Sequence, residues 1–512
     1  MSTNIVVTFL GTTSGGGPIE TRNCSSLVVD AIGDGSLWMV DCAEGTVRQF
    51  AQQPLSSTQR LKVNSVNRIF ITHMHADHSM GLITLLRNIL GFAPDPHAPP
   101  GFVGSSSNSR PPKPPILKVE IYGPVGLRAF VRTVLTLTHT RSADRYCVNE
   151  LLMPGGIPSA SRDVPEDWHS SEVGGRDILC SDDGFWREIV VQERDRSTPI
   201  VVSAGPIVHR DPCIGFVFSE QSPREPESTS NTESQTGPAQ NTLDCATIPR
   251  TLVILGDTSD PSALIPLIKE DASRSVSLLI HEATDAYIPH HIDSRGTTGS
   301  KSRNHETVRT KAIAKGHSTP AMAGAFARQI GAERLALNHI GSRFPAPPPH
   351  AGPSNFRHLC MREIEHQATR AWQPINGNRA VAVSDFDRIV IPPVFKSSGD
   401  VEGMGGSEVV VAVETTVSLT VLEQLEEVMA EPHSHGPARG RGSSGGRGGW
   451  RGGHRQHGQH GHFRSHNRQH QHDSTAGEGS IDRKREHSGR HDSASTTNSS
   501  QHIKRPRRGD DQ

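Results

Sequence analysis

The sequence predicts an α/β fold in one large globular domain, followed by a disordered tail. Between residues 1 and 395, short apolar runs alternate with stretches in which apolar residues recur at helical spacing. The runs predict strands of a sheet, and the helical spacing predicts helices that cover it. At 512 residues the chain is long enough to bury a sizeable core.

The strands are predicted from short apolar runs that end at polar residues or glycine. The first run, Ile5–Leu10, begins almost at the N-terminus, so no signal-like segment is expected before it. The later strands are predicted at Ser26–Asp30, Leu37–Asp41, Arg68–Thr72, Lys118–Tyr122, Ile200–Val208, Gly215–Ser219, Thr251–Leu255, Ser277–His281 and Arg334–Asn338.

The helices are predicted from apolar residues three and four positions apart. In Met80–Leu90 the residues Leu82, Leu85, Leu86 and Ile89 recur at this spacing, which marks a buried face. The other helices are predicted at Gly45–Gln53, Val125–Thr138, Ala263–Lys269, Asn304–Lys315, Pro320–Ile330 and Phe356–Glu365.

Several segments interrupt the alternation. They are rich in Pro, Gly, Ser or charged residues and lack periodicity, so we expect disordered loop insertions near 94–115, 153–185 and 219–249. Residues 396–432 are expected to add a strand and a helix. Residues 433–512 have almost nothing to bury, and we expect them to form a disordered Arg/Gly/His-rich tail.

The tail is basic, with 15 Lys and Arg against 7 Asp and Glu, and it holds 12 of the 28 histidines. Flexible arginines near Trp450 suit contacts with single-stranded RNA, although a solvated low-complexity tail is the plainer interpretation. The histidines could also bind metal without a catalytic role. The run Lys504–Arg508 resembles a nuclear import signal, so the expected location is the nucleus, the cytoplasm or both.

Neither disulfides nor membrane spans are expected. The seven cysteines form no C-x-x-C pair and are odd in number, which fits reduced thiols inside a cell. No apolar run reaches the length of a membrane span. We therefore expect a soluble protein that is not secreted.

The segment His73-Met74-His75-Ala76-Asp77-His78 places four candidate metal ligands within six residues. It follows an apolar strand and precedes a helix, so rigid elements hold it at both ends. His73 and His75 can bind one ion, and Asp77 and His78 an adjacent one. Imidazole and carboxylate suit zinc or a similar first-row ion. The cluster therefore predicts a two-metal hydrolase.

This segment resembles the H-x-H-x-D-H signature of the metallo-β-lactamase superfamily. The resemblance implies a four-layer αββα sandwich, here with disordered insertions and a C-terminal tail. The signature alone does not choose among lactamases, glyoxalases, sulfatases, phosphodiesterases and nucleases.

Further blocks resemble the tRNase Z family, the endonucleases that remove 3′ trailers from precursor tRNAs. They occur in the order of that family and are spread over roughly residues 5–390. The blocks are Gly11–Ser14 with Pro18 and Arg22-Asn23, Ile207–Arg210 before Gly215-Phe216, Leu255–Thr258, Leu279–Thr284, Gly316–Thr319 and Asn338–Arg343.

The resemblance implies two Zn²⁺ ions per subunit, with Mn²⁺ as an alternative. It places His73, His75 and His209 on one ion, Asp77, His78 and His339 on the other, and Asp257 between them. For the three residues outside the segment His73–His78, a purely structural role is the alternative to metal binding. His209 could cap its strand, Asp257 could be an ordinary turn residue or helix cap, and His339 could bond to backbone.

The substrate that the resemblance implies is precursor tRNA, cleaved by two-metal phosphodiester hydrolysis. Asp77 would also orient the attacking water, His317 would protonate the departing oxygen, and Glu282 would hold the His317 ring. Residues 316–319 could alternatively be a helix cap before Pro320. Substrate phosphate is expected at Ser342 and Arg343, and the alternative for Arg343 is a surface salt bridge.

The stretch Ser219–Arg250 departs from the family. A basic arm that grips tRNA usually stands at this place, but here the stretch is acidic and short of lysine. Two other functions therefore stay open, a hydrolase of a small phosphodiester or sulfate ester and a non-catalytic RNA-binding scaffold. The resemblance to compact members of the family also implies that a homodimer is possible.

Overall fold

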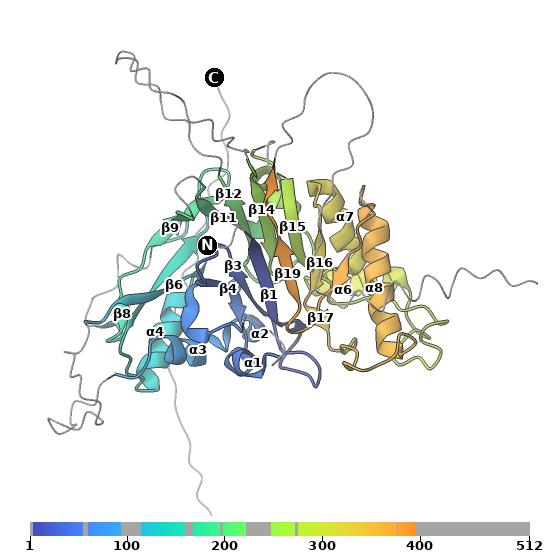
Figure 1. Cartoon of the computed structure of the whole chain (residues 1–512), viewed down its shortest axis with the longest axis horizontal. Coiled ribbons are helices and arrows are strands. Elements are labelled where there is room, and N and C mark those ends of the chain that lie inside the picture. The colour runs from blue at the N-terminus through green and yellow to red at the C-terminus, as the bar shows by residue number, and fades with distance from the viewer. Residues whose placement is uncertain are drawn as a thin grey trace, which may run out of the picture. The chain divides into compact units, whose positions relative to one another are not determined.

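The computed structural model contains two sheets packed face to face with helices on both outer surfaces (Figure 1). The described residues are 4–54, 60–93, 114–158, 167–194, 198–221, 247–271, 275–375 and 377–395. The expected tail at 433–512, the extension at 396–432 and most of the insertions near 94–115 and 219–249 lie outside these ranges.

The first sheet has nine strands in the order β19-β1-β3-β4-β5-β6-β7-β8, and β9 also pairs with β7. From β4 to β7 neighbouring strands run parallel. The strands are β1 (Ile5–Gly11), β3 (Ser26–Asp30), β4 (Leu37–Cys42), β5 (Val66–Phe70), β6 (Leu117–Pro124), β7 (Arg145–Leu152), β8 (Glu172–Val173), β9 (Asp177–Leu179) and β19 (Arg388–Ile391).

The second sheet has seven strands in the order β10-β11-β12-β14-β15-β16-β18, and from β14 to β18 they run parallel. The strands are β10 (Trp186–Gln192), β11 (Ile200–Ile207), β12 (Cys213–Glu220), β14 (Arg250–Leu255), β15 (Ser275–Glu282), β16 (Leu335–Asn338) and β18 (Val381–Ala382). Two short pairs complete the strands, β2 (Thr13–Ser14) with β17 (Ile340–Gly341) and β13 (Thr247–Ile248) with β20 (Val394–Phe395).

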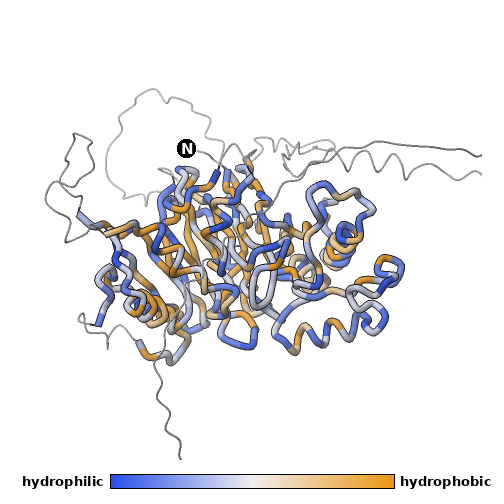
Figure 2. Tube along the Cα trace, turned by 90° about the horizontal axis from the view of Figure 1, so that it is seen from below, coloured by the Kyte–Doolittle hydropathy of each residue, from blue (hydrophilic) through white to orange (hydrophobic). Residues whose placement is uncertain are grey.

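Aromatic side chains fill the space between the two sheets. Phe70 stacks on Tyr122 with ring centroids 5.4 Å apart and meets Phe216 and Phe218 edge-on at 5.3 and 5.4 Å. Trp38 lies 6.2 Å from Phe70 and is fully buried. Offset and edge-on geometries of this kind add to the free energy of burying the rings. In the hydropathy view the apolar residues are concentrated in the strands at the centre (Figure 2).

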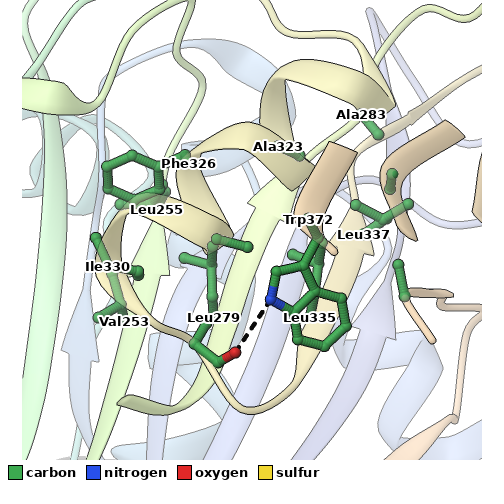
Figure 3. Close-up of a cluster of buried hydrophobic side chains, with 14 of the residues drawn as sticks. Val253, Leu255, Leu279, Ala283, Ala323, Phe326, Ile330, Leu335, Leu337 and Trp372 are labelled. Carbon is green, nitrogen blue, oxygen red and sulfur yellow. Dashed lines mark hydrogen bonds between the residues drawn. The ribbon is translucent and has the colours of Figure 1, made fainter. Parts of the chain in front are cut away.

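Helices cover the outer face of each sheet, which confirms the predicted αββα layers. On the first sheet, α3 and α4 bury an apolar face that includes Leu85 and Val131. On the second sheet, α7 and α8 pack over a cluster in which the Trp372 indole N–H donates to the Ala332 carbonyl at 3.1 Å (Figure 3). The helices are α1 (Thr46–Gln52), α2 (Ala76–Ser79), α3 (Leu82–Ile89), α4 (Leu127–Leu137), α5 (Ile265–Ile268), α6 (His305–Ala314), α7 (Pro320–Ile330) and α8 (Phe356–Trp372). Of the described helices, none has both the length and the apolar character that a membrane span requires.

The predicted strands are all present, with ends that differ by a few residues, but β7, β10, β19 and the strands of two or three residues were not predicted. In β7 the polar residues Asn149 and Glu150 are buried and interrupt the apolar run. Glu150 accepts hydrogen bonds from the backbone N–H groups of Gly126 and Arg128, both at 2.9 Å. The carboxylate thus pairs two backbone donors at the start of α4 that have no partner within the helix. The region 153–185, expected to be disordered, contains the short strands β8 and β9.

A buried carboxyl on α8 predicts how stability changes with pH. Burial raises the pKa of Glu365 to about 7, although the Ala382 N–H donates to its Oε1 at 3.0 Å. Because this pKa lies above that of the unfolded chain, the folded state loses stability as the pH rises from about 4.5 to about 7.

We expect Glu365→Gln, which keeps the acceptor for Ala382, to remove this loss. Urea unfolding should show a small gain over the wild type at pH 5 and a larger gain of about 1–2 kcal/mol at pH 8. Glu363→Gln on the same helix is the control for the change in net charge. An equal gain at pH 5 and pH 8 would contradict the prediction.

Candidate metal centre

Five candidate histidines and two aspartates meet at one edge of the sandwich, where the strands end. His73 and His75 follow β5, and Asp77 and His78 lie on the short helix α2 directly after them. Three more residues follow strands of the second sheet, namely His209 after β11, Asp257 after β14 and His339 after β16. Since the carboxyl ends of parallel strands share an edge, residues far apart in sequence converge there.

The first donor group consists of His73, His75, His209 and Asp257, whose ligand atoms all lie within 4.8 Å of one another. His73 Nε2 is 2.9 Å from His75 Nδ1, which is 3.4 Å from His209 Nε2. Asp257 Oδ2 lies 3.8 Å from His73 Nε2. Three imidazoles and a carboxylate oxygen at these distances suit a first-row metal ion.

The second donor group consists of Asp77, His78 and His339. His78 Nε2 and His339 Nε2 are 3.2 Å apart, and Asp77 Oδ2 lies 3.4 Å from the latter. The other oxygen of Asp257, Oδ1, is 3.3 Å from both imidazole nitrogens. Asp257 therefore directs one oxygen toward each group, as a bridging carboxylate would.

Every one of the five histidines uses its second ring nitrogen for a hydrogen bond that fixes the ring. Metal-binding histidines in proteins are held in this way. The partners are Thr72 Oγ1 for His73 at 3.1 Å, Asp211 Oδ2 for His75 at 2.6 Å, the Gly316 carbonyl for His209 at 2.7 Å, Asp41 Oδ2 for His78 at 2.7 Å and Thr284 Oγ1 for His339 at 2.9 Å. The remaining nitrogens face one another across the two groups, so the residues present fit a pair of metal ions.

Burial and the neighbouring charges set the protonation of these groups. Burial lowers the pKa of His73 to about 2, so this imidazole is neutral and has a lone pair free for a metal ion. Burial alone would raise the pKa of Asp257, but His339 and His78 outweigh it and the pKa falls well below the usual value. A neutral imidazole and an ionised carboxylate are the forms that bind metal.

Three of the ring partners, Asp41, Asp211 and Thr284, were not predicted from the sequence. Asp41 is the last-but-one residue of β4 and is buried, and a polar residue ending an apolar strand was the available signal. Asp211 follows His209 closely in sequence, but its partner His75 belongs to the other sheet. Such pairings depend on the tertiary fold and leave no local pattern.

Gly316 connects the first donor group to the candidate acid His317. Its φ of +76° is a conformation that other residues rarely adopt, and an added Cβ would lie 2.7 Å from His209 Nδ1. Only glycine lets this carbonyl accept from His209 while the next residue turns into the site. The structural alternative for residues 316–319 is also present, because Pro320 opens α7 and Thr319 is its cap residue without a capping side-chain bond.

His317 and Glu282 form a pair beside the metal ligands, as the sequence predicted. His317 Nδ1 is 3.2 Å from Glu282 Oε1 and 3.7 Å from Asp257 Oδ2. Glu282 is buried and accepts from the Thr258 N–H at 2.6 Å and from the Thr284 hydroxyl at 2.5 Å, so its carboxylate is fixed. Asp257, His317 and His339 also form a third set of possible metal ligands.

Ser342 and Arg343 lie at a pocket of about 520 Å³ that His317 also lines. Both residues are exposed. Arg343 donates to the Thr298 carbonyl at 3.3 Å, and the expected alternative, a salt bridge, is not found with any carboxylate in the described ranges.

The sequence was compared with known proteins. A profile of the metallo-beta-lactamase superfamily matches residues 19–144. Zinc phosphodiesterase ELAC protein 1 of Bos taurus is 31% identical over an alignment of 371 residues, and the match covers 66% of this chain and 86% of that protein. Ribonuclease Z of Streptococcus pyogenes serotype M5 (strain Manfredo) is 28% identical over 342 residues, 66% of this chain and 89% of the relative. The crystal structure of human tRNase Z, short form (ELAC1), is 27% identical, with a TM-score of 0.44 and coverage of 76% of this chain and 99% of that one.

Proposed function

Because the chain belongs to the family of ELAC protein 1 and ribonuclease Z, within the metallo-β-lactamase superfamily, we propose that it is a zinc-dependent endoribonuclease that removes the 3′ trailer from precursor tRNA. The observation that carries this proposal is the Glu282–His317 pair, 3.2 Å apart, beside two complete donor groups. A metal centre next to an imidazole that a carboxylate keeps in position suits a reaction in which the leaving group must receive a proton.

The proposed metal is zinc, two ions per subunit, with manganese as the alternative. One ion would be held by His73, His75 and His209. The other would be held by Asp77, His78 and His339, and Asp257 would contribute to both sites. Two such ions activate a water at neutral pH and neutralise the oxygens of a phosphodiester.

The protein's own residues would then orient the reactants and move one proton. Asp77 accepts a hydrogen bond from the Gly15 N–H at its Oδ2 at 2.9 Å, which fixes the carboxylate, and it would orient the attacking water. His317 would give a proton from its ring to the departing 3′-oxygen, and Glu282 would keep the ring in place. Cleavage on this side of the phosphorus leaves a 3′-hydroxyl on the tRNA and a 5′-phosphate on the trailer.

A cleavage assay with the purified protein and added zinc or manganese tests the proposal. The two substrates, assayed separately, are a trailer-bearing precursor tRNA and a small chromogenic phosphodiester. We expect specific cleavage at the trailer junction, and none after treatment with a chelator. Hydrolysis of the small diester alone would favour a small-molecule phosphodiesterase. Binding of tRNA without cleavage of either substrate would favour an RNA-binding scaffold.

Three further expectations stay predictions. They are a homodimer, a location in the nucleus or the cytoplasm, and RNA binding by the tail at 433–512. Removal of the chain after Glu431 tests the last of them, because unchanged affinity for precursor tRNA would reject a contribution of the tail.

A further inference from the structure

Positive charge surrounds the pocket that His317 lines. Four cationic side chains line it, namely Arg303, Lys311, Lys315 and Arg343, and the carboxylate of Asp285 is the one acidic group among its described lining residues. A pocket of about 520 Å³ is large enough for a ligand of about the size of a nucleotide. The charges favour an anionic ligand.

Arg303 is already bound to the protein and neutralises the acidic group. Its guanidinium lies 2.5 Å from Asp285 Oδ2 and donates to the Thr298 carbonyl at 2.9 Å, and its side chain is only 10% exposed. The same carbonyl accepts from Arg343. Arg303 therefore holds the loop that forms one wall of the pocket, and the pair with Asp285 leaves no net negative charge there.

Lys311 and Lys315, by contrast, are exposed and make no ion pair with a carboxylate of the described residues. They are four residues apart at the end of α6, so they lie on the same face of the helix and repel each other. Like charges at this spacing destabilise a helix. An anion bound between the two ammonium groups would remove that repulsion.

The position of His317 indicates which part of the RNA reaches these lysines. In-line displacement places the attacking and the departing oxygen on opposite sides of the phosphorus. As the proposed acid, His317 would stand on the side of the departing oxygen, which belongs to the mature tRNA and not to the trailer. The pocket that His317 lines would therefore receive the mature end of the RNA.

We infer that Lys311 and Lys315 bind backbone phosphates of the RNA strand 5′ of the cleaved bond, at the 3′ end of the mature tRNA. The inference rests on the proposed function, because it uses the role of His317 as the acid. The two lysines would hold the substrate from a helix beside the candidate metal centre. This contact would not depend on an arm in the stretch Ser219–Arg250.

Binding of the two products separately tests the inference. The probes are a mature-length tRNA that ends in a 3′-hydroxyl and a 5′-phosphorylated trailer oligonucleotide, each titrated against the full-length protein. For the double variant Lys311→Ala/Lys315→Ala we expect the Kd for the tRNA to rise roughly tenfold at low salt. The slope of log K against log salt should fall by roughly 1.5 to 2, and the Kd for the trailer should not change.

Two further variants serve as controls. Lys269→Ala removes an exposed lysine that does not line the pocket, and it should bind both RNAs as the wild type does. Lys311→Arg/Lys315→Arg keeps the charge and should restore both the affinity and the salt slope. This rescue separates a phosphate contact from a folding defect.

The inference is wrong if the double alanine variant binds tRNA like Lys269→Ala, or if it loses affinity for the trailer instead. Failure of the proposed function gives a different result, namely a wild-type protein that does not cleave precursor tRNA. The two failures are therefore distinguishable in one set of proteins.

Discussion

We expect His317→Ala to lower the rate of precursor-tRNA cleavage by about a hundredfold to ten-thousandfold while the zinc content stays at the wild-type level. The departing 3′-oxygen is a poor leaving group without a proton, and His317 is the imidazole that Glu282 holds at 3.2 Å beside the donor groups. Single-turnover cleavage and metal analysis of the same preparations measure the two effects.

A substrate with a leaving group that needs no proton separates acid catalysis from other roles of His317. Hydrolysis of a nitrophenyl phosphodiester should fall much less in the variant than cleavage of tRNA does. If the zinc content falls instead, His317 is a metal ligand, as the third donor set of Asp257, His317 and His339 allows. An equal loss with both substrates would also contradict the acid role.

Asp257→Asn should remove bound metal and lower activity by on the order of a thousandfold or more. This carboxylate is 2% exposed and directs one oxygen to each donor group, so its charge is shared by both sites. Because an ion that binds only the folded state stabilises it, added zinc should raise the Tm of the wild type and not that of the variant. Metal content and Tm are read on the same protein.

Asp260→Asn is the matched control for this variant. Asp260 lies three residues further along the chain, is exposed, and accepts a hydrogen bond from the Ser262 N–H at 2.9 Å. The substitution Asp260→Asn removes one negative charge near the end of the same strand, as Asp257→Asn does, but it changes no residue of either donor group. Wild-type zinc content in Asp257→Asn would show that Asp257 is not a ligand of either ion.

The convergence of the candidate ligands could be predicted where each of them follows a recognisable strand. His209, Asp257 and His339 each stand just after an apolar run, so their convergence follows from a common sheet edge. The layers were predicted for the same reason, since strand and helix periodicities are local. The exceptions are polar residues such as Glu150, whose burial against α4 breaks the pattern of β7.

What the sequence could not supply are contacts made across the fold. The hydrogen bond of Asp211 to His75 joins residues 136 positions apart, and that of Thr284 to His339 depends on where two neighbouring strands end. The two lysines of α6 look like ordinary surface residues in the sequence. Only the structure shows that they line one pocket together with His317.

Each donor group takes ligands from both sheets, His73 and His75 with His209, and Asp77 and His78 with His339. Bound metal would therefore act as a pair of cross-links between the two halves of the sandwich, closing loops of more than a hundred residues. Such cross-links restrict the unfolded chain far more than they change the folded one. Removal of the metal should thus lower the free energy of unfolding, while the aromatic interior around Phe70 still holds the two sheets together in the folded state.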